Sequence, residues 1–200
     1  MYSTLVFDLG NVLVPFDYAP IIAKLNKIQN GLGDRFVQLY KDNYEIHRNY
    51  ERGNLHTEEF LTVALEWVNY KLFGREFCKL FSSVFKIDDR VVGLLPILKK
   101  NYQLVLLSNT NLIHKKYGWG GYDFLKYFDK QILSFEVGAV KPEKKIFRAV
   151  EEFTQQPPSK HFYIDDAEEY VSAAKELGWG GIQFTSYEKL YEDLKEKKII

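Results

Sequence analysis

Reactive polar side chains directly follow three apolar runs of this chain. Asp8 comes after Leu-Val-Phe, Ser108 and Asn109 come after Leu-Val-Leu-Leu, and Asp165 and Asp166 come after Phe-Tyr-Ile. A single acid in such a place is usually a turn or capping residue, although burying its charge is costly unless another group answers it. Three groups after three separate runs favour a shared site.

Phosphate and metal chemistry is what such a site would support. Carboxylates gathered at one place repel one another and take up protons unless a cation lies among them. Mg²⁺ prefers carboxylate, backbone and phosphate oxygens as ligands. Lys141 supplies a further charge, and we expect Pro142 to occupy the first turn of a helix and to hold Lys141 extended at its entrance. A lysine there could neutralise Asp8 and bind a phosphate.

A parallel sheet would bring these distant groups together. Apolar runs of strand length alternate with segments of helical spacing, a pattern that predicts an α/β fold with a Rossmann-like parallel sheet and helices on both faces. Residues 143–154 are one such helical segment. The carboxyl ends of parallel strands meet at one edge, where the polar groups would converge. The predicted strands are 4–7, 103–107, 131–135, 161–164 and 181–184.

The long segment between the first two strands breaks this alternation. It has helical character throughout, and Thr57 before two glutamates is expected to be a helix N-cap. We predict a helical cap domain at 16–87, inserted after the first strand, and a core domain at 1–15 and 88–200. Such an insertion would lie over the carboxyl ends of the strands. The predicted helices are 18–29, 34–50, 57–70, 75–84 and 89–100.

The amino-acid composition excludes some classes of binding partner. Lysine plus arginine and aspartate plus glutamate number 27 each, so the net charge is zero and nothing favours nucleic acid or an anionic membrane. A signal peptide and an apolar run long enough to span a membrane are both lacking, which predicts a cytoplasmic protein. Cys78 is the single cysteine and forms no internal disulfide, in agreement with a reducing compartment. We expect a small phosphorylated molecule as the partner.

Four motifs together resemble those of the haloacid dehalogenase-like (HAD) hydrolase superfamily. They are FDLGNVLV, LLSNTN, VGAVKPEKKIF and YIDDAEE, in that order and at plausible separations. The first motif and the segment ERGNLHTEEF also resemble the branch of bacterial sugar-phosphate phosphatases that includes alpha-D-glucose-1-phosphate phosphatase. The resemblance spans nearly the whole chain, and it implies that the insertion is the helical cap of this group.

The resemblance implies a role for each motif residue. Asp8 would be the catalytic nucleophile that forms an aspartyl-phosphate. Ser108 would donate a hydrogen bond to the transferring phosphoryl group, with Asn109 beside it as a second substrate-binding residue. Lys141 would be both catalytic and substrate-binding, because it would balance charge on the nucleophile and on the phosphoryl oxygens.

A magnesium site is also implied by the resemblance. Its ligands would be the Asp8 carboxylate, the backbone carbonyl of Gly10 and the Asp166 carboxylate. Asp165 would bind the ion directly or through a water molecule.

Position 10 departs from the usual pattern of the superfamily. Its phosphatases commonly have a second aspartate there as general acid and base, a function worth about 10² to 10⁴ in rate, and this chain has Gly10. The substrate could have a leaving group that needs little protonation, such as an anomeric sugar phosphate; the cap could supply another acid; or the reaction could differ. The resembling branch shares the glycine, which favours the first possibility, and a phosphomutase is disfavoured.

Two residues bear on that departure. His47 is our hypothesis for a substitute acid, although its position on one helical face with two tyrosines fits packing in the cap better. Asn11 could instead orient water. A further departure is Tyr170, which stands in the last motif where many relatives have asparagine.

The function predicted is a magnesium-dependent phosphatase of a small phosphorylated metabolite, such as a sugar phosphate. One alternative is a 2-haloacid dehalogenase, which uses the same nucleophile on carbon; the paired acids at 165 and 166 would have no use in a metal-free enzyme. A second alternative is a protein that binds a phosphorylated ligand or a protein partner with little turnover.

Overall fold

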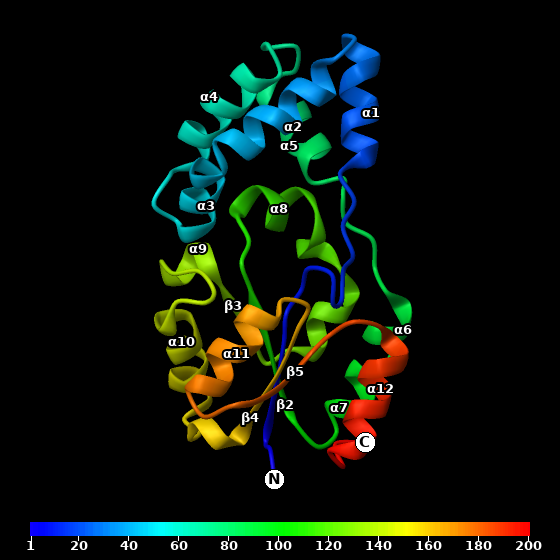
Figure 1. Ribbon diagram of the computed structural model, residues 1–200, viewed down its shortest axis with the longest axis vertical. Coiled ribbons are helices and arrows are strands. Elements are labelled where there is room, and N and C mark those ends of the chain that lie inside the picture. The colour runs from blue at the N-terminus through cyan, green and yellow to red at the C-terminus, as the bar shows by residue number, and fades with distance from the viewer.

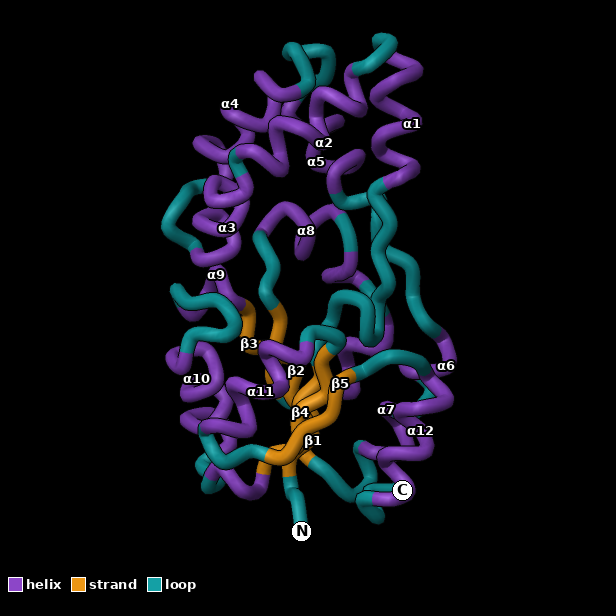
Figure 2. Tube along the Cα trace, viewed as in Figure 1, coloured by secondary structure: helices purple, strands orange, loops and turns teal.

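A computed structural model describes residues 1–200 and contains one five-stranded sheet in the order β3-β2-β1-β4-β5. Every neighbouring pair of strands is parallel, so the predicted Rossmann-like α/β fold is confirmed. Helices flank the sheet, as Figures 1 and 2 show. The strands are β1 (Thr4–Phe7), β2 (Gln103–Ser108), β3 (Lys130–Leu133), β4 (His161–Asp165) and β5 (Gly180–Gln183).

The central strand β1 is apolar because both of its faces are buried. All four of its residues are buried, and side chains of consecutive strand residues point to opposite faces. Leu5 and Phe7 belong to one core cluster, together with residues of α6 (Asp89–Val92), α7 (Leu95–Leu98) and α12 (Tyr187–Glu196). Val6 belongs to the cluster on the other face, with residues of α10 (Lys144–Thr154) and α11 (Glu168–Glu176).

A separate helical unit lies above the carboxyl ends of the strands (Figure 1). It has its own core cluster, rich in aromatic rings such as Phe36, Phe60 and Phe77. The helix α8 (Leu112–Tyr117), which follows β2, inserts Ile113 into this cluster. The unit consists of α1 (Ala19–Ile28), α2 (Leu32–Asp42), α3 (Tyr44–Arg52), α4 (Thr57–Trp67) and α5 (Gly74–Phe81).

Two connections join the helical unit to the sheet and run side by side. Phe16 and Phe85 form an antiparallel bridge, and the N–H of Lys86 donates to the carbonyl of Pro15 at 2.9 Å. The short helix α9 (Ser134–Val137) lies next to α3 (Figure 1). The remaining elements are 3₁₀ turns at Trp119–Gly121, Asp123–Tyr127 and Pro158–Lys160.

Several predicted elements differ in detail from the structure. The helix predicted at 34–50 is two helices, separated at Asn43, whose side-chain amide donates to the carbonyl of Leu39 at 2.8 Å and so ends α2. The helix predicted at 89–100 is also two helices, α6 and α7, because Pro96 lacks the N–H needed to continue the first one.

Three further local predictions were wrong. The strand predicted at 131–135 ends at Leu133, and α9 begins at Ser134. The N-cap of α4 is His56 and not Thr57; the His56 N–H donates to the Glu59 carboxylate at 2.8 Å. Helix α10 begins at Lys144, so Pro142 precedes its first turn.

Candidate active site

Asp8, Lys141 and Asp165 meet at the carboxyl edge of the sheet. Asp8 directly follows β1, and its N–H donates to the carbonyl of Ile164 on β4 at 2.9 Å. The Lys141 Nζ donates to Asp8 Oδ1 and to Asp165 Oδ2, both at 2.7 Å. The three residues are only 7%, 1% and 0% exposed, so these are buried ion pairs with little screening by solvent.

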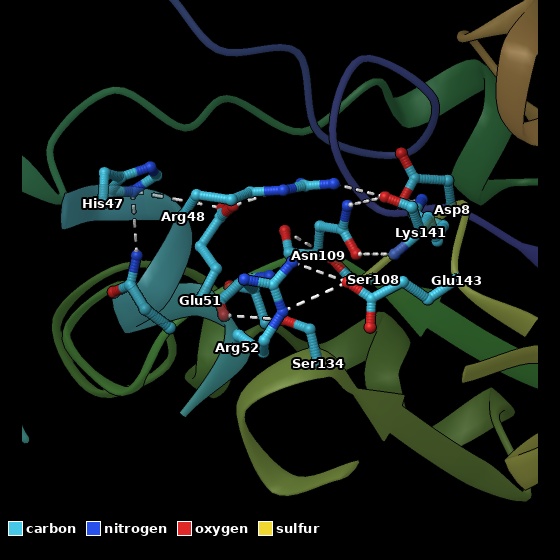
Figure 3. A network of polar contacts seen from close by, with 12 residues as sticks. Asp8, His47, Arg48, Glu51, Arg52, Ser108, Asn109, Ser134, Lys141 and Glu143 are labelled. Atoms are coloured by element: carbon cyan, nitrogen blue, oxygen red, sulfur yellow. Dashed lines mark hydrogen bonds and ion pairs between the residues drawn. The ribbon is translucent and has the colours of Figure 1, made fainter. Parts of the chain in front are cut away.

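Asn109 fixes the segment that bears Lys141. The backbone N–H of Lys141 donates to Asn109 Oδ1 at 2.7 Å, and Asn109 Nδ2 donates to the Lys141 carbonyl at 3.3 Å. Arg48 of α3 donates to the same carbonyl (Figure 3). The Lys141 Nζ lies 5.1 Å from the centroid of the Tyr170 ring, which therefore covers the ammonium with an aromatic face. Tyr170, the departure in the last motif, thus packs against the central lysine.

Ser108 is the last residue of β2 and is buried. Its Oγ is 3.4 Å from the carbonyl of Asn109, a long contact that leaves the hydroxyl available to a ligand. The loop after it is held by Ser134, whose Oγ accepts from the Thr110 N–H and donates to the Thr110 carbonyl, both at 2.9 Å. Hydrogen bonds therefore fix the backbone of the loop that follows Ser108.

Asp166 lies beside Asp165 but has different partners. Asp165 accepts from Lys141, from the Tyr163 hydroxyl and, at 2.8 Å, from the backbone N–H of Ala167. Asp166 is less buried and accepts from Asn11 Nδ2 at 3.0 Å. Asn11 therefore positions this acid; its φ of 54° lies in the left-handed region that asparagine tolerates.

The three carboxylates lie close enough together to bind a single cation. One oxygen each from Asp8, Asp165 and Asp166 lies within 4.8 Å of the other two. Burial raises the pKa of Asp8 to about 7, against the lowering effect of Lys141, and burial also raises the pKa of Asp166. Burial alone would lower the pKa of Lys141, but Asp8 and Asp165 outweigh it and the pKa is raised. Three acids and one ammonium leave an excess of negative charge, which a divalent cation would balance.

Gly10 faces an aromatic ring on the side where a Cβ would point. A Cβ built at Gly10 would lie 3.1 Å from Cε1 of Phe16 and 4.0 Å from Asp8 Oδ2. Phe16 belongs to the connection between β1 and α1, and is 40% exposed. The Phe16 ring therefore lies in part of the space that a side chain at position 10 would need.

Two adjoining compartments form the cleft between the sheet edge and the helical unit. The charged pocket has a volume of about 230 Å³ and includes Asp8, Lys141, Asp166 and Tyr170. The aromatic chamber has a volume of about 270 Å³ and includes Ser108, three tyrosines and Trp119. Five residues line both compartments: Gly10, Phe16, Tyr44, Glu51 and Asn109. One ligand can therefore extend from the charged pocket into the chamber.

Helix α3 places three polar side chains in this cleft. His47 lines the chamber, Arg48 lines the charged pocket, and Glu51 lines both. In Figure 3, Arg48 reaches from α3 toward Lys141, whereas His47 lies at the far end of the network from Asp8. Our reasoning from the sequence missed Arg48 and Glu51. The signal available was their spacing, because Glu51 follows His47 by four residues and so lies on the same helical face.

His47 is packed and hydrogen-bonded inside the chamber wall. Its Nδ1 is 3.0 Å from the Tyr40 hydroxyl and its Nε2 is 3.4 Å from Asn111 Nδ2. Burial lowers the pKa of His47. His114 lines the same chamber, and its pKa is lowered further by burial. Both imidazoles are neutral at neutral pH.

The sequence profile of the haloacid dehalogenase-like hydrolases matches residues 2–178. The chain therefore belongs to the haloacid dehalogenase-like hydrolase family, as its motifs predicted, and it is a hydrolase by that membership. The narrower resemblance to the alpha-D-glucose-1-phosphate phosphatase branch stays a prediction. None of the helices combines the length and the apolar character needed to cross a membrane.

Similar proteins include a phosphatase of a sugar-alcohol phosphate. The chain is 28% identical over 191 residues to D-ribitol-5-phosphate phosphatase of Bacteroides thetaiotaomicron, with 92% of each chain covered. A HAD-family enzyme of that bacterium, solved as a magnesium complex, superposes with a TM-score of 0.81 and 29% identity, covering 95% of this chain and 98% of that one. L-2-haloacid dehalogenase of Xanthobacter autotrophicus, at 18% identity and a TM-score of 0.66 over 100% of this chain and 85% of that one, shares the fold alone.

Proposed function

We propose that this protein is a magnesium-dependent phosphatase that hydrolyses a hydroxylated phosphate monoester through an aspartyl-phosphate on Asp8. One observation carries the proposal: a buried lysine bridges Asp8 and Asp165, and Asp166 completes a group of carboxylates close enough for one cation. We propose that this site binds a small molecule and that the enzyme is cytoplasmic.

The residues present fit a magnesium ion. Asp8, the carbonyl of Gly10 and Asp166 would hold it, with Asp165 as a direct or water-bridged ligand, since hard oxygen donors are what Mg²⁺ prefers. Asp166 is the more available of the two paired acids, because Asp165 already accepts from Lys141, Tyr163 and the Ala167 N–H. When bound, the ion would act as a Lewis acid toward the phosphoryl oxygens. A HAD-family enzyme of B. thetaiotaomicron binds both magnesium and inorganic phosphate, which supports this assignment.

The side chains of this site have complementary roles in the proposed reaction. The Asp8 carboxylate attacks phosphorus, and Lys141 holds it in place through its ion pair. The ammonium also stabilises negative charge on the phosphoryl oxygens. Ser108 donates from the end of β2, whereas Asn109 positions Lys141 through its two hydrogen bonds to the backbone.

The chamber supports a substrate with hydroxyl groups. Aromatic faces from Tyr18, Tyr40 and Tyr44 can pack against sugar carbons, and their hydroxyls can exchange hydrogen bonds with sugar hydroxyls. The similarity to D-ribitol-5-phosphate phosphatase supports a sugar or sugar-alcohol phosphate. We propose residues 16–87 as the cap domain that closes this chamber over the core domain, 1–15 and 88–200.

A substrate screen tests the proposal. Pentitol, pentose and hexose phosphates and chloroacetate are incubated with the protein in Mg²⁺ or EDTA, and phosphate and chloride release are measured. We expect phosphate release from at least one hydroxylated phosphate in Mg²⁺, and its loss in EDTA. Chloride release that persists in EDTA would instead show a dehalogenase. Tight binding of a phosphate without turnover would show the phospho-ligand-binding alternative.

A further inference from the structure

The leaving-group oxygen of a phosphate monoester must lie at the junction of the two compartments. Its phosphorus would occupy the charged pocket beside Asp8 and Lys141, and its carbon skeleton would occupy the chamber. A proton donor for that oxygen must therefore line both compartments. Of the five residues that do so, only Tyr44 and Glu51 have titratable side chains.

Glu51 is a buried carboxylate without a hydrogen-bond donor. Its side chain is 10% exposed, and its nearest nitrogen neighbours are the Arg48 guanidinium, with Nη1 at 3.7 Å, and the neutral His47 imidazole, with Nε2 at 4.0 Å. Both distances exceed that of a hydrogen bond. The Glu51 carboxylate is not enclosed by protein atoms but lines the cleft, where a ligand can complete its hydrogen bonding. The arrangement therefore leaves Glu51 free to bond a group in the cleft.

Other titratable residues of the cleft are poorly suited to move this proton. Burial raises the pKa of Tyr44, so its phenol does not act as a base at neutral pH. His47 and His114 line only the chamber, and Asp166 lies on the charged side with Asn11 as its partner. Position 10 carries no side chain, and Phe16 closes the space beside it.

We propose that Glu51 is the general acid and base of the reaction and replaces the acid absent at position 10. This inference rests on the proposed phosphatase function. The helical unit would thus contribute a catalytic residue as well as the chamber wall.

Two steps return Glu51 to its starting state. Asp8 attacks phosphorus, the bond from phosphorus to the leaving oxygen breaks, and the protonated Glu51 carboxyl gives its proton to that oxygen to release an alcohol. Water then attacks the phosphorus of the aspartyl-phosphate and gives a proton to the Glu51 carboxylate. The bond from phosphorus to Asp8 breaks, which releases phosphate and restores both side chains.

Leaving-group dependence tests this role. Wild type, Glu51→Gln, Glu51→Asp and the control Glu45→Gln are assayed in Mg²⁺ with p-nitrophenyl phosphate and with phenyl phosphate. The value of kcat/KM reports the steps up to release of the phenol. Phenolate needs protonation to depart far more than p-nitrophenolate does, and neither substrate has a sugar hydroxyl for Glu51 to bind.

We expect Glu51→Gln to lower kcat/KM for phenyl phosphate by about 10² to 10⁴, and by at least about tenfold less for p-nitrophenyl phosphate. Glu51→Asp should recover part of the phenyl phosphate activity, because it keeps the carboxyl group. Glu45→Gln makes the same chemical change on the exposed side of α3 and should match wild type. Equal losses for both substrates, or no loss, would overturn the proposal.

A second measurement uses wild type alone and does not depend on the variants folding. Across a series of substituted phenyl phosphates, protonation of the leaving oxygen predicts that kcat/KM changes little with leaving-group pKa. A steep dependence in wild type would overturn the role of Glu51 while leaving the phosphatase intact. Absence of turnover of every phosphate by wild type would instead reject the proposed function itself.

Discussion

The two compartments of the cleft are built in different ways. The charged pocket is assembled from residues that directly follow β1 and β4, with Lys141 held against them by Asn109. The aromatic chamber is assembled mainly from α3, from the residues between β1 and α1, and from the segment that runs from the end of β2 through α8. Strand topology therefore sets the geometry of the charged groups, whereas helix packing sets the shape of the chamber.

Their electrostatics differ as well. Buried ion pairs hold charge in the pocket, and desolvation of Asp8 is opposed by Lys141 at 2.7 Å. In the chamber, burial lowers the pKa of His47 and His114, so both are neutral. Only Glu51 brings a carboxyl group to the chamber wall, and it does so where the two compartments join.

Removal of the carboxylate of Asp8 should have the largest effect on the charged side. Asp8→Asn should lower kcat by about 10⁴ to 10⁶, as for loss of a nucleophile elsewhere. The fold should persist, because Lys141 keeps its ion pair with Asp165. Phosphate release measures the loss of kcat, and circular dichroism checks that the fold persists. The control is Asp123→Asn, a substitution at an exposed residue. A variant that retains a tenth of wild-type activity would refute the role of Asp8.

Loss of Lys141 should destabilise the charged pocket strongly. Lys141→Met leaves Asp8 and Asp165 buried without their shared cation, which should lower the free energy of unfolding by about 3 to 5 kcal/mol. Urea unfolding in EDTA measures the change. Lys144→Met, an exposed lysine at the start of α10, should change it by less than about 0.5 kcal/mol. Similar values for the two variants would show that the ion pairs add little.

Restoring the usual acid at position 10 should create a clash at the junction. Gly10→Asp should lower the free energy of unfolding by about 1 to 3 kcal/mol, because its Cβ would meet the Phe16 ring at 3.1 Å. Phe16→Ala should relieve part of that loss, giving a coupling of at least about 0.5 kcal/mol in a double-mutant cycle. Gly121→Asp is the control, since nothing lies within 4 Å of its added Cβ. Additive effects of the two substitutions would contradict the clash.

The chamber should make the protein less stable in mild acid. Below about pH 6.5 the histidines of the unfolded chain become protonated. His114 stays neutral in the folded state, because burial lowers its pKa there. The free energy of unfolding therefore falls as the pH is lowered. The part of this loss that His114 alone causes is at most about 1.4 kcal/mol for each pH unit below that value. Asp8, whose pKa is raised, has the opposite sign.

The variant His114→Gln separates these contributions. Urea unfolding in EDTA at pH 7, 6 and 5 should show a shallower fall for this variant than for wild type, because Asp8 contributes equally to both. Parallel curves would mean that His114 is protonated in the folded state.

Much of the fold and of the charged pocket was predictable from the sequence. Apolar runs followed by polar residues fix where parallel strands end, so the meeting of Asp8 and Asp165 followed from topology. The exact helix ends were less predictable, because periodicity reveals neither the hydrogen bond by which Asn43 ends α2 nor the missing N–H of Pro96.

Most of the residues that form the chamber could not be predicted from the sequence. His47 was noticed because it shares a helical face with tyrosines, but its distance from Asp8 depends on how α3 lies over the sheet (Figure 3). Arg48 and Glu51 resemble ordinary surface charges on a helix until tertiary packing buries them. Phe16 likewise gave no sign that its ring would close the space beside Gly10.

Trapping the phosphorylated enzyme tests the central claim most directly. Wild type turning over p-nitrophenyl phosphate in Mg²⁺ is quenched with acid, reduced with borohydride to mark any acyl phosphate, digested and mapped by mass spectrometry. We predict modification at Asp8 alone, and none when EDTA replaces Mg²⁺. Continuous turnover with Asp8 unmodified, or with the mark on another residue, would contradict the account.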